Sequence, residues 1–120
     1  MVIGAVAEID ESAEVVLQME QLGTAHAVDQ ARDALQGFKG DVVVLYGDTP
    51  FVSADTLERM VAARGSADLV VLGFHAEDPA RYGRLVMQGD SLERIVEFKD
   101  ASAAERSIDF CNSGLMACDA

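Results

Sequence analysis

The stretch that decides the fold is DVVVLYGDTP, residues 41–50, in which an apolar run leads directly into an acidic turn. Residues 42–45 form a short run rich in β-branched side chains, which is typical of a strand buried on both faces of a parallel sheet. Gly47 and Pro50 end this strand and leave Asp48 at its carboxyl end. Ligands of open α/β sheets bind at that end, where a carboxylate can hold Mg²⁺ against phosphates. The alternative is that Asp48 only shapes the turn.

Expected strands and helices alternate along the first part of the chain, and a hairpin follows. This order predicts an α/β fold with a Rossmann-like, mixed, mainly parallel sheet flanked by helices, in one domain over residues 1–120. The expected strands are 2–7, 13–17, 41–46, 68–74, 84–88, 92–98 and 108–117, and the expected helices are 24–36, 53–64 and 102–107.

The composition excludes several classes of protein. Half of the 120 residues are hydrophobic and a quarter are charged, as in globular domains. The net charge of −12 repels phosphate backbones and anionic lipids, so neither nucleic acid nor a membrane is an expected partner. No apolar stretch approaches the roughly 20 residues that cross a bilayer, and no basic region of a signal peptide begins the chain, which together predict a cytoplasmic protein. Cys111 and Cys118 lie too far apart on one expected strand to form a disulfide.

A further motif carries groups suited to nucleotide binding. In QMEQLGTAHAV, residues 18–28, Gly23 lets a ligand approach the main chain. Thr24 is expected to cap the helix, and with the following amides it forms a cluster of main-chain donors. The Gln18 amide has the donor and acceptor needed to read a uracil edge. An ordinary helix start with solvated glutamines is the alternative. In the turn DTP, the same choice between a ligand contact and a local structural role applies to Asp48.

Three polar or flexible positions in the second half suit a sugar. Gly83, at the mouth of the expected hairpin, could admit a ligand close to its main chain, although turn glycines are commoner. Glu97 could accept hydrogen bonds from hydroxyl groups, or it could simply occupy the solvent face of its strand. Asn112 lies in an otherwise apolar strand, so its amide needs a partner, either a neighbouring main chain or a ligand.

Together and in this order, the motifs QLGTAHAV, VLYGDTPF, RYGRLV, IVEFKDA and CNSG resemble the middle of the bacterial N-acetylglucosamine-1-phosphate uridyltransferases. The resemblance covers about residues 16–117. It implies that Gln18, Gly23 and Thr24 contact the uridine nucleotide, and that Tyr46, Gly47 and Asp48 line the same pocket.

The resemblance also implies that Asp48 holds the cofactor Mg²⁺ and acts as the catalytic residue. It further implies that Gly83, Glu97 and Asn112 contact the N-acetylglucosamine moiety. Phe98 stands where histidine is common in the family.

The implied reaction converts UTP and N-acetylglucosamine-1-phosphate into UDP-N-acetylglucosamine and pyrophosphate, which feeds peptidoglycan and lipopolysaccharide synthesis. The family's glycine-rich loop with its lysine, a later metal-binding asparagine and the acetyltransferase domain are not found in these 120 residues. We therefore expect a partial nucleotide-diphospho-sugar transferase domain that is inactive alone, from a parent that is homotrimeric through its acetyltransferase domain. The alternatives are another sugar-phosphate nucleotidyltransferase, or a non-catalytic α/β module that binds a nucleotide or a cation.

Overall fold

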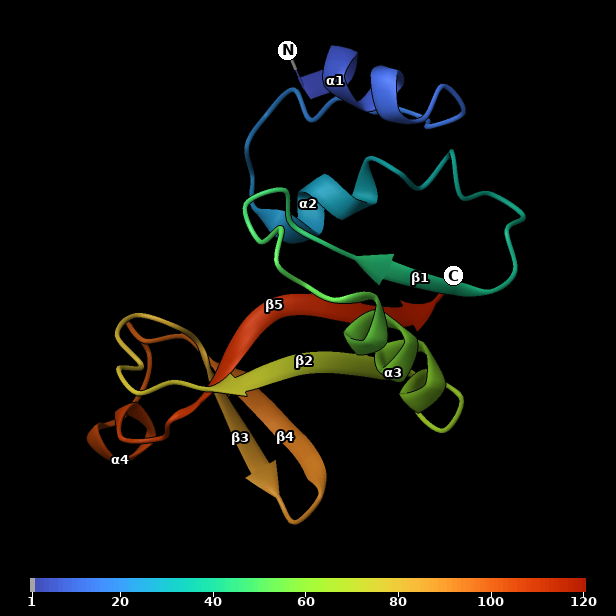
Figure 1. Ribbon diagram of the computed structural model, residues 1–120. Coiled ribbons are helices and arrows are strands. Elements are labelled where there is room, and N and C mark those ends of the chain that lie inside the picture. Colours follow the sequence, from blue (N-terminus) through green and yellow to red (C-terminus); the bar gives the residue numbers. More distant parts are fainter. Residues whose placement is uncertain (1) are drawn as a thin grey trace. The chain divides into compact units, whose positions relative to one another are not determined.

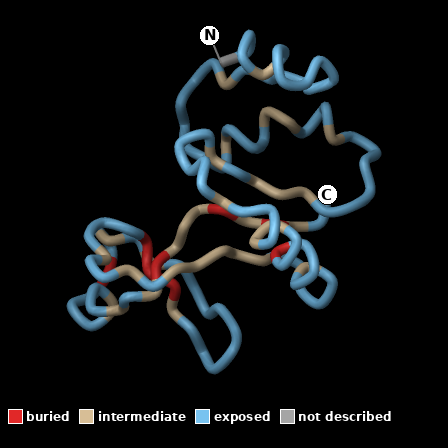
Figure 2. The backbone as a smooth tube through the Cα atoms, viewed as in Figure 1, coloured by how far each residue is buried: buried red, intermediate tan, exposed pale blue. Residues whose placement is uncertain are grey.

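The computed structural model describes the backbone of residues 2–120 and the side chains from residue 3 onward. Two compact units divide the chain, Met1–Lys39 and Gly40–Ala120. Within the described residues, every buried residue belongs to the second unit (Figure 2). None of the helices found in residues 2–120 has the length and apolar character needed to span a bilayer. The prediction of one partial domain over residues 1–120 stays a prediction.

The first unit holds two helices, α1 (Val2–Ile9) and α2 (Thr24–Asp29). The strands expected at residues 2–7 and 13–17 are wrong, because the former segment is helical and the latter is irregular. A short apolar run does not distinguish strand from helix, and the alanines within α1 favour the helix. The helix expected over residues 24–36 ends early, and successive turns continue it to Gly37, whose φ is +80°.

A five-stranded sheet forms the second unit (Figure 1). Its strands are β1 (Asp41–Val44), β2 (Leu69–His75), β3 (Arg84–Gln88), β4 (Ser91–Val96) and β5 (Phe110–Asp119). The long β5 pairs with β1, β2 and β3, and β3 and β4 form the expected hairpin. Cys111 and Cys118 both lie on β5 and are free thiols.

The α/β fold is confirmed, but its mainly parallel character is not, because each strand pair among the described residues is antiparallel. The strands β1 and β2 run in the same direction on either side of the connecting helix, as expected for a β–α–β unit. They are not neighbours, since both pair with β5. An apolar run shows that a strand is buried, but it does not show which strand lies beside it.

Helix α3 (Ala54–Arg64) covers the sheet and completes the core. It begins as expected, with the Ser53 side chain accepting a hydrogen bond from the main-chain N–H of Thr56. The core cluster consists of Met60, Leu115 and Ala117. At the end of the helix, Arg64 pairs with Asp41 at 2.7 Å and with Asp119 at 3.3 Å, which offsets the repulsion between these two facing carboxylates of β1 and β5.

A complete capping box begins the short helix α4 (Ala103–Arg106), which was expected over residues 102–107. Ser102 and Glu105 each bind the other's main-chain N–H, and Arg94 contacts Glu105 at 2.5 Å. The hydrogen bonds with the Ser102 side chain and main chain, followed by that with Arg94, lower the pKa of Glu105 from its usual 4.5 to about 2.

The stability contributed by Glu105 is expected to depend on pH. A carboxyl with a lowered pKa stabilises the fold above its unfolded pKa, so this contribution is complete above about pH 4.5 and is lost as the pH falls towards 2. We expect Glu105→Gln to flatten the fall in urea stability across this range. The control is Glu93→Gln, which removes the other carboxylate on Arg94 and leaves the capping box intact. Equal pH slopes for wild type and Glu105→Gln would contradict this prediction.

Candidate active site

The turn that follows β1 exposes the carboxylate of Asp48. The Thr49 main-chain N–H and its hydroxyl both donate to the Tyr46 carbonyl oxygen, at 3.2 and 3.1 Å, and close the turn around Gly47. Asp48 is exposed. In the described part of the chain, its carboxylate has neither a hydrogen bond nor an ion pair, so both oxygens are available to a ligand.

Tyr46 joins this turn to the core. Its ring packs against the cluster of Met60, Leu115 and Ala117. A glycine opposite the ring is required, because a Cβ placed on Gly114 would lie 2.3 Å from the Tyr46 ring. Gly114 also has a φ of +85°, a conformation that other residues rarely adopt. The position of Tyr46 therefore depends on a glycine two residues beyond Asn112.

The structure brings Gly83, Glu97 and Asn112 together. The Asn112 main-chain N–H donates to the Gly83 carbonyl oxygen at 2.8 Å, which continues the pairing between β3 and β5. A Cβ on Gly83 would lie 3.2 Å from Glu97 Oε1, so the glycine gives that carboxylate room. Asn112 Oδ1 accepts a hydrogen bond from the Gly114 N–H at 2.9 Å, while Asn112 Nδ2 has no partner among residues 2–120. One end of this amide is thus satisfied locally, and the other can donate to a ligand.

Two cations beside Glu97 were missed by the sequence reasoning. A hollow of about 220 Å³ is lined by Arg81, Glu97, Phe98 and Lys99. Both cations are exposed and lie within the motifs RYGRLV and IVEFKDA, in a chain with only nine basic residues. A search for basic residues inside the motifs would have identified them. A second hollow of about 590 Å³ lies between α3 and β2 and contains none of the nine predicted site residues.

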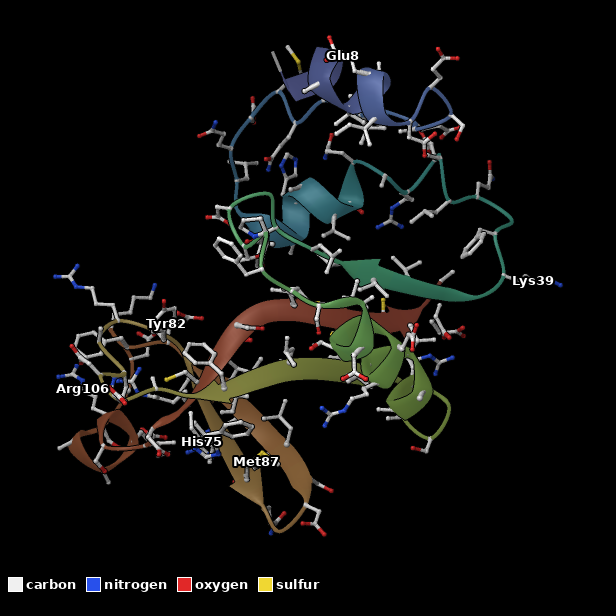
Figure 3. The ribbon with its side chains drawn as sticks, viewed as in Figure 1. Glu8, Lys39, His75, Tyr82, Met87 and Arg106 are labelled. Atoms are coloured by element: carbon white, nitrogen blue, oxygen red, sulfur yellow. The ribbon has the colours of Figure 1, made fainter. Side chains whose placement is uncertain are left out.

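The buried guanidinium of Arg84 supports this part of the site. Its side chain is 2% exposed and donates to the carbonyl oxygens of Pro79, Ala80, Tyr82 and Arg106. Its Nε has no partner in the described structure. Tyr82 and the α4 residue Arg106 are labelled in Figure 3. Arg84 thereby ties the segment before Gly83 to the end of α4.

Gln18, Gly23 and Thr24 belong to the first unit, and the other six predicted site residues belong to the second. Gly23, with a φ of +102°, is the N-cap of α2, so the expectation that Thr24 caps this helix is wrong. The Ala27 N–H donates to the Gly23 carbonyl oxygen at 3.1 Å. Gln18 Nε2 donates to the same oxygen, also at 3.1 Å, which links the Gln18 amide to the start of α2.

A metal ion would find one carboxylate ligand at the turn after β1. Among the described residues, no cluster of three or more histidine, cysteine, aspartate or glutamate side chains could enclose an ion. This donor set does not fit a closed protein cage. It fits Mg²⁺, which is usually held by one or two carboxylates, several waters and the phosphates of a substrate.

Sequence comparison places these features in a known family, since the nucleotidyl transferase family matches residues 3–115. The chain belongs to the nucleotidyl transferase family. It is 77% identical over all 120 residues to "Bifunctional protein GlmU" of Ruegeria sp. (strain TM1040), and the match spans 27% of that protein's length. It is 78% identical over 111 residues, or 92% of the chain, to the protein of the same name from Ruegeria pomeroyi, and this match spans 25% of that protein's length.

This nucleotidyl transferase chain spans about a quarter of the length of the curated relatives it matches. The resemblance found from the five motifs is confirmed by these identities. The roles of the nine individual residues stay predictions.

Proposed function

We propose that this chain provides the nucleotide and sugar contacts for Mg²⁺-dependent uridylyl transfer from UTP to N-acetylglucosamine-1-phosphate. The products are UDP-N-acetylglucosamine and pyrophosphate. The observation that carries the proposal is the exposed Asp48 carboxylate, free of protein partners in the described chain and placed after β1 beside a fixed Tyr46. The names of the relatives and the nucleotidyl transferase family support this class of reaction.

The reaction is a direct displacement. An oxygen of the sugar phosphate attacks the α-phosphorus of UTP, and the bond from that phosphorus to the oxygen bridging the α- and β-phosphates breaks. The electron pair leaves with pyrophosphate, so no covalent enzyme intermediate is needed. The residues of the chain contribute by positioning the two substrates. When bound, Mg²⁺ neutralises charge on the phosphates and is held by Asp48.

The second unit suits the sugar phosphate. Glu97 and the free Asn112 Nδ2 offer an acceptor and a donor for the hydroxyl and acetamido groups. Arg81 and Lys99, which line the same hollow as Glu97, supply local positive charge in a chain with a net charge of −12. This local charge favours an anionic ligand where the overall field opposes it.

A hybrid enzyme tests the proposal. In this hybrid, the matching segment of bifunctional protein GlmU from Ruegeria sp. (strain TM1040) is replaced by the present 120 residues. We expect it to release pyrophosphate from UTP and N-acetylglucosamine-1-phosphate, and to do so much more slowly with ATP, CTP or GTP, or with glucose-1-phosphate. A hybrid that is folded but inactive, or that prefers another pair of substrates, would contradict the proposal.

The isolated chain offers a second measurement. We expect weak binding of UDP-N-acetylglucosamine by titration calorimetry and negligible turnover. Binding should weaken in Gln18→Ala and should be unaffected in Gln36→Ala, which changes an exposed glutamine outside the motifs. The proposed homotrimer and cytoplasmic location belong to the parent protein and require its full length.

A further inference from the structure

The guanidinium of Arg84 holds four main-chain carbonyl groups, an arrangement that we call the Arg84 clamp. Its Nη1 donates to the carbonyl oxygen of Pro79 at 3.2 Å and to that of Tyr82. Its Nη2 donates to the carbonyl oxygen of Ala80 at 3.2 Å and to that of Arg106 at 3.3 Å. These contacts use all the hydrogens on the two terminal nitrogens of the guanidinium. The clamp therefore fixes a loop, residues 79–82, against the end of α4.

The positive charge of Arg84 has no carboxylate beside it. Among residues 2–120, no ion pair includes Arg84, although its side chain is 2% exposed. Burial of an unpaired charge is unfavourable, and an apolar side chain often stabilises such a position better. A planar fork of donors is what distinguishes arginine here, because it can reach several carbonyl groups at once. The arrangement thus indicates a need for this fork beyond the filling of space.

The clamped loop has a strained backbone. Ala80 has a φ of +39°, the one positive value among the described residues other than glycine. Residues with a Cβ adopt this conformation only at a cost in energy, and they keep it where the surroundings hold it. Both peptide groups of Ala80 are held, since its N–H donates to Asp78 Oδ1 at 3.1 Å and its carbonyl oxygen accepts from Arg84. Loss of the clamp is therefore expected to let the loop relax.

Both walls of the hollow of about 220 Å³ contact the clamp. One wall is Arg81, which belongs to the clamped loop, and the other is the segment 97–99. The guanidinium carbon of Arg84 lies 5.9 Å from the centroid of the Phe98 ring. Arg106, whose carbonyl group is in the clamp, donates from Nε to the Phe98 carbonyl oxygen at 3.3 Å. The distance between the two walls thus depends on Arg84.

We propose that Arg84 is a positioning residue that fixes the width of this hollow and thereby the affinity for the sugar phosphate. Gly83, which follows the clamped loop, leaves room for Glu97 and accepts a hydrogen bond from the Asn112 N–H. The inference rests on the proposed function, in which these three residues contact the N-acetylglucosamine moiety. It adds a residue that is too buried to contact the ligand and that sets where Arg81 lies relative to Glu97.

Arg84→Lys tests the clamp while it keeps the charge. Lysine replaces the planar fork by one nitrogen with three hydrogens, which cannot reach all four carbonyl groups. In the hybrid enzyme, we expect the KM for N-acetylglucosamine-1-phosphate to rise roughly tenfold, about the effect of one or two lost hydrogen bonds, and the KM for UTP to change by less than about twofold. A purely structural role would change stability and the amount of active enzyme, but it would not affect one substrate selectively.

Ala80→Val tests the loop without a change at the buried charge. The Ala80 side chain is exposed, and a β-branched residue disfavours a positive φ. We expect the same selective rise in the KM for the sugar phosphate. In the Arg84→Lys background, Ala80→Val should add little, because both substitutions release the same loop. The control is Ala13→Val, at an exposed alanine without a positive φ, which should leave both KM values unchanged.

Glu97→Gln separates this inference from the function beneath it. A selective rise in the KM for the sugar phosphate in Glu97→Gln and in folded Arg84→Lys supports the inference. A rise in Glu97→Gln alone, or an equal rise for both substrates in Arg84→Lys, overturns it and leaves the proposed function standing. If neither variant raises this KM, the hollow does not bind the sugar phosphate, and that part of the proposed function fails as well. If Arg84→Lys does not fold, Ala80→Val decides by the same criteria.

Discussion

Asp48→Asn is expected to lower turnover of the hybrid enzyme by at least about a hundredfold at saturating Mg²⁺, because the substitution removes the carboxylate that we propose holds the ion. The side chain is exposed and has no protein partner in the described residues, so its removal should not disturb packing. Pyrophosphate release, measured over a range of Mg²⁺ concentrations, gives both the rate and the apparent metal affinity.

The control for Asp48→Asn is Asp90→Asn. Asp90 lies in the exposed turn between β3 and β4, so this substitution makes the same change of charge away from the proposed site. We expect Asp90→Asn to retain full turnover and both variants to unfold at the wild-type urea concentration. Pyrophosphate release by Asp48→Asn at the wild-type rate would remove Asp48 from the mechanism.

Gly114→Ala is expected to destabilise the 120-residue chain by about 2–5 kcal/mol. An alanine in a left-handed conformation costs about 1–2 kcal/mol, and Gly114 has a φ of +85°. The added Cβ would also lie 2.3 Å from the Tyr46 ring, and overpacking of this kind costs about 1–3 kcal/mol. Urea unfolding measures the combined effect.

The matched control for Gly114→Ala is Gly65→Ala. Gly65 has an ordinary helical φ of −59°, and a Cβ there would meet the Ala62 carbonyl oxygen at a normal 3.4 Å. We expect this change to alter stability by less than about 0.5 kcal/mol. In Gly114→Ala, the strain also moves Tyr46, so affinity for UDP-N-acetylglucosamine should fall along with stability. Equal midpoints for the two alanine variants would show that the turn after β1 adapts freely.

The local structure of the second unit could be predicted from the sequence because short-range signals agree there. Ser53 provides a side-chain acceptor at the start of α3, and Ser102 with Glu105 forms a capping box. The hairpin strand Arg84–Gln88 has the expected bounds. In each case, the interacting groups lie within a few residues of one another, so the local sequence determines the geometry.

The neighbours of each strand could not be predicted in the same way. Which strand pairs with β1 depends on β5, about 70 residues later, and an apolar run carries no information about its partner. The prediction for the first unit was wrong for another reason. Its apolar segment 2–7 is short enough to suit either strand or helix.

The candidate site was predicted mainly through motifs, since each polar residue taken alone had an equally plausible local role. Asn112 illustrates both roles in the structure. Its Oδ1 accepts a hydrogen bond from the Gly114 N–H, which is a local role, while its Nδ2 is open to a ligand. Lys99 lies two residues from Glu97, but Arg81 could not be placed beside them from its sequence position, because the hollow forms only when the segment around Arg81 and the segment after β4 meet.

The central place of β5 has a consequence for synthesis of the chain on the ribosome. Among the described residues, both β1 and β2 pair with β5, which follows them in the sequence. Until β5 has been made, these two apolar strands lack the partner that they have in the described structure. We therefore expect this pairing, which joins widely separated residues, to form only after β5 is synthesised, and the strand edges to be open to misassociation until then.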